Sequence, residues 1–325
     1  GVCCLLAPWL LHSGDALFAL WLLLWGITVA GDSPQFSALT AQNAPPAVAG
    51  SVPLAFTSRN ARMVCERMDR ADIPVHAGAQ APVDQERAPD GDGAFAESGL
   101  GALTLPPALR SVASNDAVGW MAQTLRAHPA GSITLCATGP LTNLALLHRR
   151  DPEAFARIGR IGVMGGSFNL LPPNHVRRGN ITPWAEFNFY MDPVAAQEVL
   201  NAGVPVLLLP LDVTHLFVST PDRMERARAL PRHGQEVALM LDAAAHLDRP
   251  KFGADGAFQH DTTVLAALLY PHLFQTRRGQ VQVVTTGPAA GGCLLLPDEA
   301  ARVEVATGTT DPDAFFDLFF DALSG

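Results

Sequence analysis

Short apolar runs alternate with amphipathic segments along most of the chain, and this alternation predicts strands alternating with helices. The pattern predicts strands over residues 73–76, 132–137, 158–164, 204–209 and 280–286. It predicts helices over residues 57–70, 115–128, 144–150, 193–200, 235–247, 262–269 and 311–323. The segments 80–95 and 167–192 lack a clear period, so we expect loops there, the second of them functional.

The most apolar strand segments, SITLCA and VPVLLL, are typical of strands buried on both faces. The alternation therefore predicts an α/β fold in which an open, mostly parallel central sheet is flanked by helices. No internal repeat or linker interrupts the pattern, so we expect a single domain over residues 1–325, with 1–50 as an atypical N-terminal segment. A further strand of the same sheet is expected near residues 27–40.

Polar clusters follow several predicted strands, at the sheet edge where ligands bind in such folds. Thr138 follows SITLCA, Gly165 and Gly166 follow the strand at 158–164, and Asp212 follows VPVLLL. We expect Thr138, Gly166, Asn188 and Asp261 to converge at this edge.

The N-terminal segment contains an unusually apolar run, ALFALWLLLWGITVAG, at residues 16–31. It is shorter than the roughly 20 residues of a spanning helix, and it lacks the basic flank of a signal peptide. We therefore interpret it as a buried helix over 16–24 followed by a buried strand, and we expect no membrane association. The competing interpretation is a membrane anchor.

Composition excludes several classes of protein. The apolar share of 48% and charged share of 16% are those of a globular chain. A net charge of -9 without a basic block argues against a nucleic-acid binder, because such proteins need a basic face. The five cysteines include no CxxC pair, which argues against a disulfide framework or a structural zinc site. A reducing compartment, and hence a cytoplasmic location, is expected.

Two polar clusters contain residues that could bind a sugar or a metal. In CATGPLTN, a turn forced by glycine and proline could expose the Thr138 carbonyl, although most strand-to-helix turns look like this. In AEFNFYMDP, Glu186 and Asn188 alternate with aromatic residues. An extended segment would place these two polar side chains on one face, together able to hold sugar hydroxyls. The alternative is that they cap Asp192, Pro193 and the next helix.

Two further clusters lie nearer the C-terminus. Asp212 in LDVTH either binds a ligand or caps a turn. The pair His260-Asp261 opens an apolar helix, where a plain N-cap is the common explanation. The functional alternative is a carboxylate metal ligand beside a proton donor for a leaving group.

Together these patterns resemble the inosine–uridine-type nucleoside hydrolases. The matching segments are SVPLAFTSRNARMVCE, DIPVHAGA, ESGLG, TGPLTNLA, VMGG, GN with AEFNFYMDP, LDVTH and HD, in family order from about residue 48 onward. The resemblance implies a ribonucleoside hydrolase that cleaves the N-glycosidic bond to free base and ribose, in purine and pyrimidine salvage. It also implies the open α/β fold, one Ca²⁺ per subunit, and a homodimer or homotetramer.

The resemblance further implies roles for individual residues around the metal and the base. The Thr138 backbone carbonyl and the Asp261 carboxylate match calcium ligands, and Asp15 matches a third. His260 matches the position that approaches the leaving base. An aspartate is expected to take a proton from the water that attacks the anomeric carbon, through an oxocarbenium-like transition state.

Four positions match residues that hold the ribose. Asn180 and Glu186 match residues on the 5′-hydroxyl, and Asn188 matches one on the lower ribose hydroxyls. The family's ribose-binding Asn in VxGN falls on Ser51 or on Asp32, and the helix downstream favours Ser51.

The N-terminus departs from the family pattern. Members open with a strand ending in DxDPGxDD, whereas the corresponding stretch here is PWLLHSGDA at 8–16. Only Asp15 remains, at a calcium-ligand position. Leu10 occupies the place of the general base and Gly14 that of a ribose-binding Asp, so no general base is identified.

Several interpretations of this departure remain open. The chain is an active hydrolase with a rearranged N-terminus, a catalytically inactive homologue that binds ribose or nucleosides, or a chain whose first 50 residues are not the native opening. A membrane-associated binding module anchored by residues 16–31 is the alternative of another class. We expect weak or absent nucleoside hydrolysis with residual ribose binding.

Overall fold

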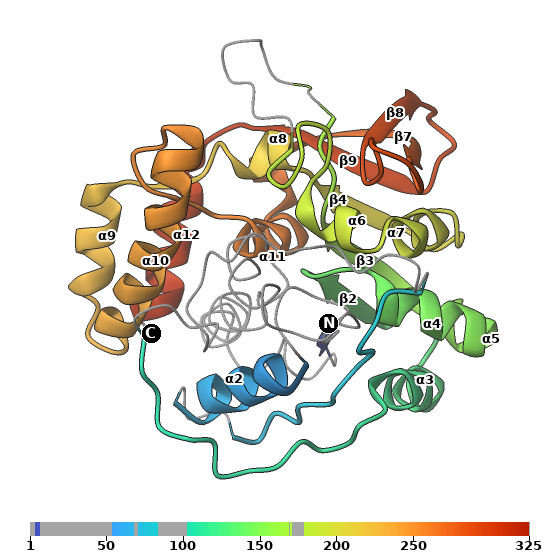
Figure 1. The fold of residues 1–325 in the computed structure, drawn as a ribbon, viewed down its shortest axis with the longest axis horizontal. Coiled ribbons are helices and arrows are strands. Elements are labelled where there is room, and N and C mark those ends of the chain that lie inside the picture. Colours follow the sequence, from blue (N-terminus) through green and yellow to red (C-terminus); the bar gives the residue numbers. More distant parts are fainter. Residues whose placement is uncertain are drawn as a thin grey trace.

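A seven-stranded mixed sheet forms the centre of the protein (Figure 1). The computed structural model describes residues 4–6, 54–67, 71–83, 103–168, 170 and 179–324. The strand order is β1-β2-β3-β4-β9-β7-β8. The bounds are β1 Cys4–Leu6, β2 Ile133–Ala137, β3 Ile158–Met164, β4 Val206–Leu209, β7 Phe274–Val283, β8 Cys293–Pro297 and β9 Val303–Thr309.

The four central strands of this sheet, β2, β3, β4 and β9, are parallel to one another. Strand β1 pairs antiparallel with β2 at one edge, and β7 and β8 add antiparallel strands at the other. A separate two-stranded sheet joins β5 Val218–Ser219 to β6 Ala257–Phe258. The expected α/β fold with a mostly parallel central sheet is confirmed.

Helices cover both faces of the sheet (Figure 1). One apolar cluster packs α3, α4, α5 and α7 against the strands, and a second packs α2 and α8 to α12. The helix bounds are α2 Leu54–Arg67, α3 Ala117–Ala127, α4 Thr142–Arg150, α5 Pro152–Phe155, α6 Phe187–Met191, α7 Pro193–Leu200, α8 Leu211–Thr214, α9 Pro221–Arg228, α10 Gly234–Phe252, α11 Asp261–Leu269 and α12 Pro312–Ser324. A 3₁₀ turn, Pro271–Leu273, follows α11.

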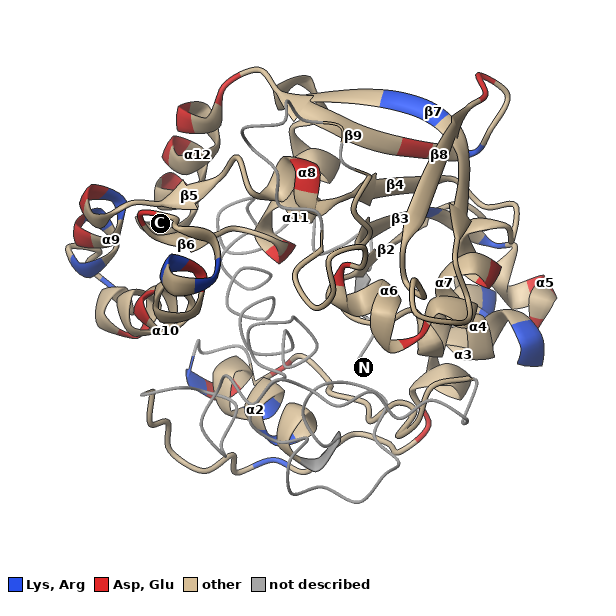
Figure 2. Cartoon of the chain, turned by 45° about the horizontal axis from the view of Figure 1, so that its top comes forward, with Lys and Arg blue, Asp and Glu red and all other residues tan. Residues whose placement is uncertain are grey.

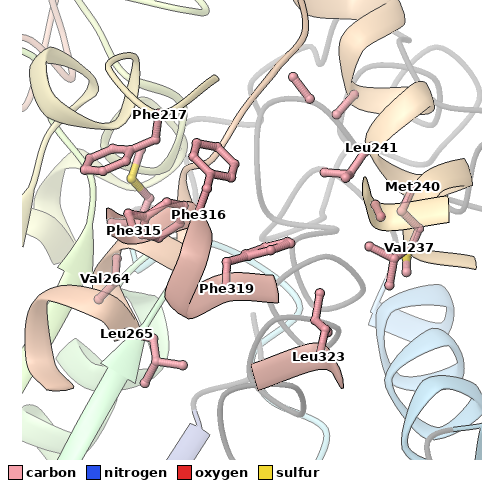
Figure 3. Packing of buried hydrophobic residues seen from close by; sticks show 14 of the residues in the cluster. Phe217, Val237, Met240, Leu241, Val264, Leu265, Phe315, Phe316, Phe319 and Leu323 are labelled. Atoms are coloured by element: carbon pink, nitrogen blue, oxygen red, sulfur yellow. The ribbon is translucent and has the colours of Figure 1, made fainter. Parts of the chain in front are cut away.

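Phenylalanines of α12 form the centre of the second cluster (Figure 3). The ring of Phe315 lies 4.6 Å from that of Phe217, which follows α8, and it meets Phe316 edge-on at 5.0 Å. Burying an aromatic side chain contributes roughly 2–3 kcal/mol. This packing fixes the position of α8 and α11, both of which carry candidate site residues.

Several predicted elements have the expected position. The bounds of β3 and α7 match the prediction, β2 and β4 lie within the predicted strands, and α3, α4, α11 and α12 differ at their ends by one or two residues. Helix α2 begins three residues before the prediction, and α10 extends five residues beyond it, to Phe252.

Other predictions were wrong. Residues 73–76 form no strand, because His76 makes only an isolated bridge to Ser114. The strand predicted at 280–286 has other bounds: it is β7, which begins at Phe274, ends at Val283 and runs antiparallel to β9. The segment 167–192 contains the helix α6 and is therefore not a loop throughout.

The N-terminal predictions, a helix over 16–24 and a strand near 27–40, lie outside the described residues. Within the described part of the chain, the structure contains no helix with both the length and the apolar character needed to cross a bilayer.

Candidate active site

The Asn188 side chain joins the ends of two parallel strands. Its Nδ2 donates to the carbonyl of Thr138, just after β2, at 3.1 Å and to the carbonyl of Met164, the last residue of β3, at 3.0 Å. Both N–H groups of the amide are therefore used. Its Oδ1 is buried and has no hydrogen-bond partner among the described residues. Asn188 thus presents one acceptor oxygen at the carboxyl ends of the strands.

Glu186 is the N-cap of α6, the short helix that carries Asn188. Its Oε1 accepts from the Asn188 backbone N–H at 2.8 Å, and its Oε2 accepts from Phe189 at 3.1 Å and Gly166 at 3.0 Å. Of the two alternatives, the extended segment does not occur, because the Glu186 carboxylate accepts from N–H groups at a helix start. Complete burial raises the pKa of Glu186 to about 7, against the opposing effect of these hydrogen bonds.

Asn180 approaches the same helix from the preceding turn. Its Oδ1 accepts from the Phe187 backbone N–H at 2.9 Å, and the residue is buried. Gly165 allows this close packing, since a Cβ there would lie 2.3 Å from the ring of Phe189. The structure therefore brings Asn180, Glu186 and Asn188 together around one helix start.

Asp192 is a structural residue in the same segment. Its Oδ2 accepts from the Thr142 hydroxyl at 2.6 Å and from the Val83 backbone at 2.9 Å. Its Oδ1 caps α7 through the Ala195 N–H at 3.0 Å. Asn143 similarly accepts from the Ala79 backbone at 2.8 Å. Asp192 therefore caps α7 and holds residues of two other segments, and Asn143 holds the backbone near Ala79.

His260 lies on the other side of these strand ends, immediately before α11. Its Nδ1 is 2.8 Å from the Thr214 hydroxyl of α8, so the LDVTH and HD motifs meet directly. Burial lowers the pKa of His260 to about 3, with a smaller contribution from the Lys251 charge. The imidazole is therefore neutral near pH 7.

Aromatic rings surround this histidine. The ring of His215 stacks on Phe258 with centroids 4.1 Å apart, and it lies 5.4 Å from His260 and 5.0 Å from Phe252. Flat apolar rings of this kind can pack against a planar base.

Asp212 caps a turn. Its carboxylate accepts from the Phe168 N–H at 2.7 Å and the Leu170 N–H at 2.6 Å, which holds the loop after β3. Between the two interpretations of this residue, these contacts favour the turn cap over a ligand-binding role.

Asp261 opens α11 close to the end of β2. Its charge contributes, after burial, to raising the pKa of the Cys136 thiol to about 12, and Cys136 precedes Thr138 by two residues. Helix α11 packs directly on β3, since a Cβ at Gly162 would lie 2.9 Å from Val264. Figure 2 shows acidic positions on α8 and α11 and beside α6 around this region of the sheet.

The oxygen atoms at this edge suit a hard cation. Within the described residues, no three His, Cys, Asp or Glu side chains form a group that could hold a metal. The Thr138 carbonyl, the Asp261 carboxylate and the buried Asn188 Oδ1 are nevertheless all oxygen donors, the type that Ca²⁺ prefers. The predicted residues Asp15 and Ser51 lie outside the described residues.

Two contributors to the site were not singled out from the sequence. The Met164 carbonyl carries no side-chain signal, although its position at the end of an apolar strand places it at the ligand-binding edge. Thr214 lies within LDVTH beside the residues that drew attention, and only the fold shows that it meets His260.

Comparisons with known proteins identify the family. The family model described as inosine-uridine preferring nucleoside hydrolase matches residues 43–317. The chain is 37% identical over 280 residues to the pyrimidine-specific ribonucleoside hydrolase RihA of Klebsiella pneumoniae, covering 82% of this chain and 85% of that protein.

Two solved structures have the same fold. The plant nucleoside hydrolase PpNRh1 superposes with a TM-score of 0.77 at 26% identity, covering 94% of this chain and 96% of that one. The purine-preferring ribonucleoside hydrolase from Gardnerella vaginalis gives a TM-score of 0.75 at 26% identity, covering 83% and 86%. The chain therefore belongs to the inosine-uridine preferring nucleoside hydrolase family and is, as a member of it, a hydrolase that acts on N-glycosyl bonds.

Proposed function

We propose that the protein hydrolyses ribonucleosides to free base and ribose at the edge where β2 and β3 end. The observation that carries this proposal is the Asn188 side chain, whose two N–H groups are held by the Thr138 and Met164 carbonyls. Its remaining atom, Oδ1, is a buried acceptor. A buried polar atom is costly unless something binds it, and a ribose hydroxyl or a cation would do so.

The ribose is held by Asn188, Asn180 and Glu186 in this proposal. Asn188 Oδ1 accepts a hydrogen bond from a lower ribose hydroxyl. Asn180 and Glu186 would bind the 5′-hydroxyl. Because backbone hydrogen bonds fix Asn180 and Glu186, little side-chain entropy is lost on binding. Ser51 would add a further ribose contact.

Calcium fits the oxygen donors at this edge of the sheet. The Thr138 carbonyl and the Asp261 carboxylate would hold the ion, and Asp15 would add a third ligand from the N-terminal segment. When bound, Ca²⁺ supplies positive charge that holds ribose hydroxyls and favours ionisation of water. The role of Asp261 is to bring a negative charge to the end of β2, where it already acts on Cys136.

The base lies towards His260 in this proposal, against the aromatic rings of His215 and Phe258. The neutral imidazole of His260 offers an N–H to the departing base, which gains negative charge as the glycosidic bond breaks. Uridine and inosine are both first substrates to assay, since the relative RihA is named pyrimidine-specific and the Gardnerella vaginalis enzyme purine-preferring.

The turnover is expected to be slow. Leu10 stands where the family has its general base, and a missing base lowers the rate by a factor of about 10²–10⁴. On family resemblance, the proposal includes a homodimer or homotetramer. It also includes a cytoplasmic location and a role in nucleoside salvage.

A reducing-sugar assay on inosine and uridine with millimolar calcium tests the proposal. We expect ribose release well below the roughly 10 s⁻¹ of a median enzyme, and its loss in Asp261→Ala. Asp255→Ala is the matched control, because Asp255 is an exposed aspartate a few residues away. Equal ribose release by wild type and Asp261→Ala would contradict the proposed site. Turnover of several per second that is lost in Asp261→Ala would instead overturn the expected slow rate.

A further inference from the structure

The Thr214 hydroxyl has one partner in the described structure, the Nδ1 atom of His260, at 2.8 Å. Thr214 is completely buried, and its backbone N–H is already bonded to the Pro210 carbonyl. The hydroxyl and the imidazole nitrogen must therefore satisfy each other.

Only one arrangement of protons satisfies both groups. If Nδ1 carried the proton and donated it, the Thr214 hydroxyl would accept, and its own proton would be buried with no acceptor among the described residues. A buried donor without an acceptor is strongly disfavoured. If the hydroxyl donates to Nδ1 instead, both groups are satisfied. The ring proton then lies on Nε2, which forms no hydrogen bond within the described part of the chain.

We propose that Thr214 is a positioning residue that fixes His260 in the tautomer with its proton on Nε2, so that the imidazole presents a donor to the leaving base. This inference rests on the proposed function, because it concerns the same site. A nucleobase that departs from ribose gains electron density on a ring nitrogen or a carbonyl oxygen, and both are acceptors. A ring with its proton on Nδ1 would offer a lone pair to these acceptors and repel them.

The neighbouring rings restrict the alternative of a reoriented imidazole. His215 lies 5.4 Å from His260 at an interplanar angle of 53°, and Phe258 lies 6.1 Å away at 50°. These contacts limit rotation of the ring, while the Thr214 bond determines which nitrogen faces α8. The neighbouring rings thus set the orientation of the His260 ring, and the Thr214 hydroxyl sets its tautomer.

The tautomer can be measured without any activity. Long-range ¹H–¹⁵N correlation spectra of protein labelled at histidine report which ring nitrogen carries the proton, and His260→Gln identifies the His260 signals. We expect the Nε2–H form in the wild type and in Thr214→Ser, which keeps the hydroxyl. An Nδ1–H form in the wild type would overturn the proposal, whether or not the protein hydrolyses nucleosides.

The functional consequence is tested with two leaving groups. Thr214→Val removes the hydroxyl at nearly constant size, and it should lower kcat on uridine or inosine by about 5- to 100-fold with KM changed less than about twofold. On p-nitrophenyl riboside, whose phenolate leaves without a proton, the same variant should differ from wild type by less than about twofold.

Controls separate the possible outcomes. Thr214→Ser should recover most of the nucleoside rate. Thr124→Val, a change at a half-buried hydroxyl on α3 that loses a bond to the Trp120 carbonyl, should have no effect on either substrate. Equal losses on both substrates in Thr214→Val would show a general structural role and overturn the proposal. A wild type inactive on both substrates would refute the proposed function, while the spectra would still decide the tautomer.

Discussion

The two sides of the candidate site are held in different ways. On the proposed ribose side, Asn180, Glu186 and Asn188 make their hydrogen bonds to backbone groups of α6 and of the segments that follow β2 and β3. On the base side, His260 is held by one hydroxyl and by stacked or tilted rings. The residues of the proposed ribose side thus bond to the backbone, whereas His260 on the proposed base side is held mainly by contacts with other side chains.

This difference implies different tolerance to change. A residue whose side chain satisfies buried backbone groups cannot be replaced without leaving those groups unpaired. Rings that pack against one another can be exchanged for other apolar side chains at modest cost. We therefore expect substitutions on the base side to change base preference while ribose binding stays the same.

The largest expected effect is that of Asn188→Ala. The Thr138 and Met164 carbonyls would both lose a donor, which should lower the free energy of unfolding by roughly 2–6 kcal/mol. Urea unfolding measures this, with Asn201→Ala, an exposed asparagine after α7, as the matched control. A loss below about 1 kcal/mol would mean that the amide does not hold the strand ends together.

The next effect concerns pH and Glu186. Burial raises its pKa to about 7 in the folded state, above its ordinary value of 4.5. Between pH 4.5 and pH 7 the folded state binds more protons than the unfolded state. Protonation of Glu186 therefore stabilises the folded state fully at pH 4, and this stabilisation is lost as the pH rises through 7. The loss should be roughly 3 kcal/mol.

Unfolding experiments from pH 4 to pH 8 on the wild type and Glu186→Gln measure that loss. The variant has no carboxyl group at this position, so its stability should fall less over the same range. Identical pH dependence in the two proteins would show that Glu186 keeps an ordinary pKa.

The smallest effect is expected on the base side, for Phe258→Leu. Apolar character is kept and stability should fall by about 1 kcal/mol, because the stack with His215 is lost. The ratio of kcat/KM for inosine to that for uridine should change about 3- to 10-fold, since a purine and a pyrimidine differ in ring area. An unchanged ratio with an equal loss for both substrates would place the base elsewhere.

The sequence predicted three of the four parallel strands, β2, β3 and β4, because their segments are largely apolar. In β3 and α7, the period and the Gly or Pro at the boundary agree with the tertiary structure. Strand β9 was missed, although its buried valines at 303 and 305 alternate with Glu304, the pattern of a half-buried strand. Helix α9 was missed because its sequence is largely charged and only two of its residues are buried.

The sequence named Asn180, Glu186 and Asn188, which the structure brings together, but it did not predict their geometry. The alternation around Glu186 left an extended segment and a capping role open. In the structure, N-cap hydrogen bonds to Glu186 start a five-residue helix there. A long-range contact, Glu186 with the Gly166 N–H twenty residues away, stabilises that helix start, and no local pattern encodes it. The pairing of Thr214 with His260 likewise joins segments 46 residues apart.

The central claim is that one edge of the sheet binds both a cation and ribose, and a crystal structure with calcium and ribose tests it most directly. The account predicts Ca²⁺ at about 2.3–2.6 Å from the Thr138 carbonyl and the Asp261 carboxylate, with a ribose hydroxyl on Asn188 Oδ1. Calcium bound elsewhere, or a Thr138 carbonyl and Asp261 carboxylate more than about 10 Å apart, would contradict it, because one cation cannot join ligands at that separation.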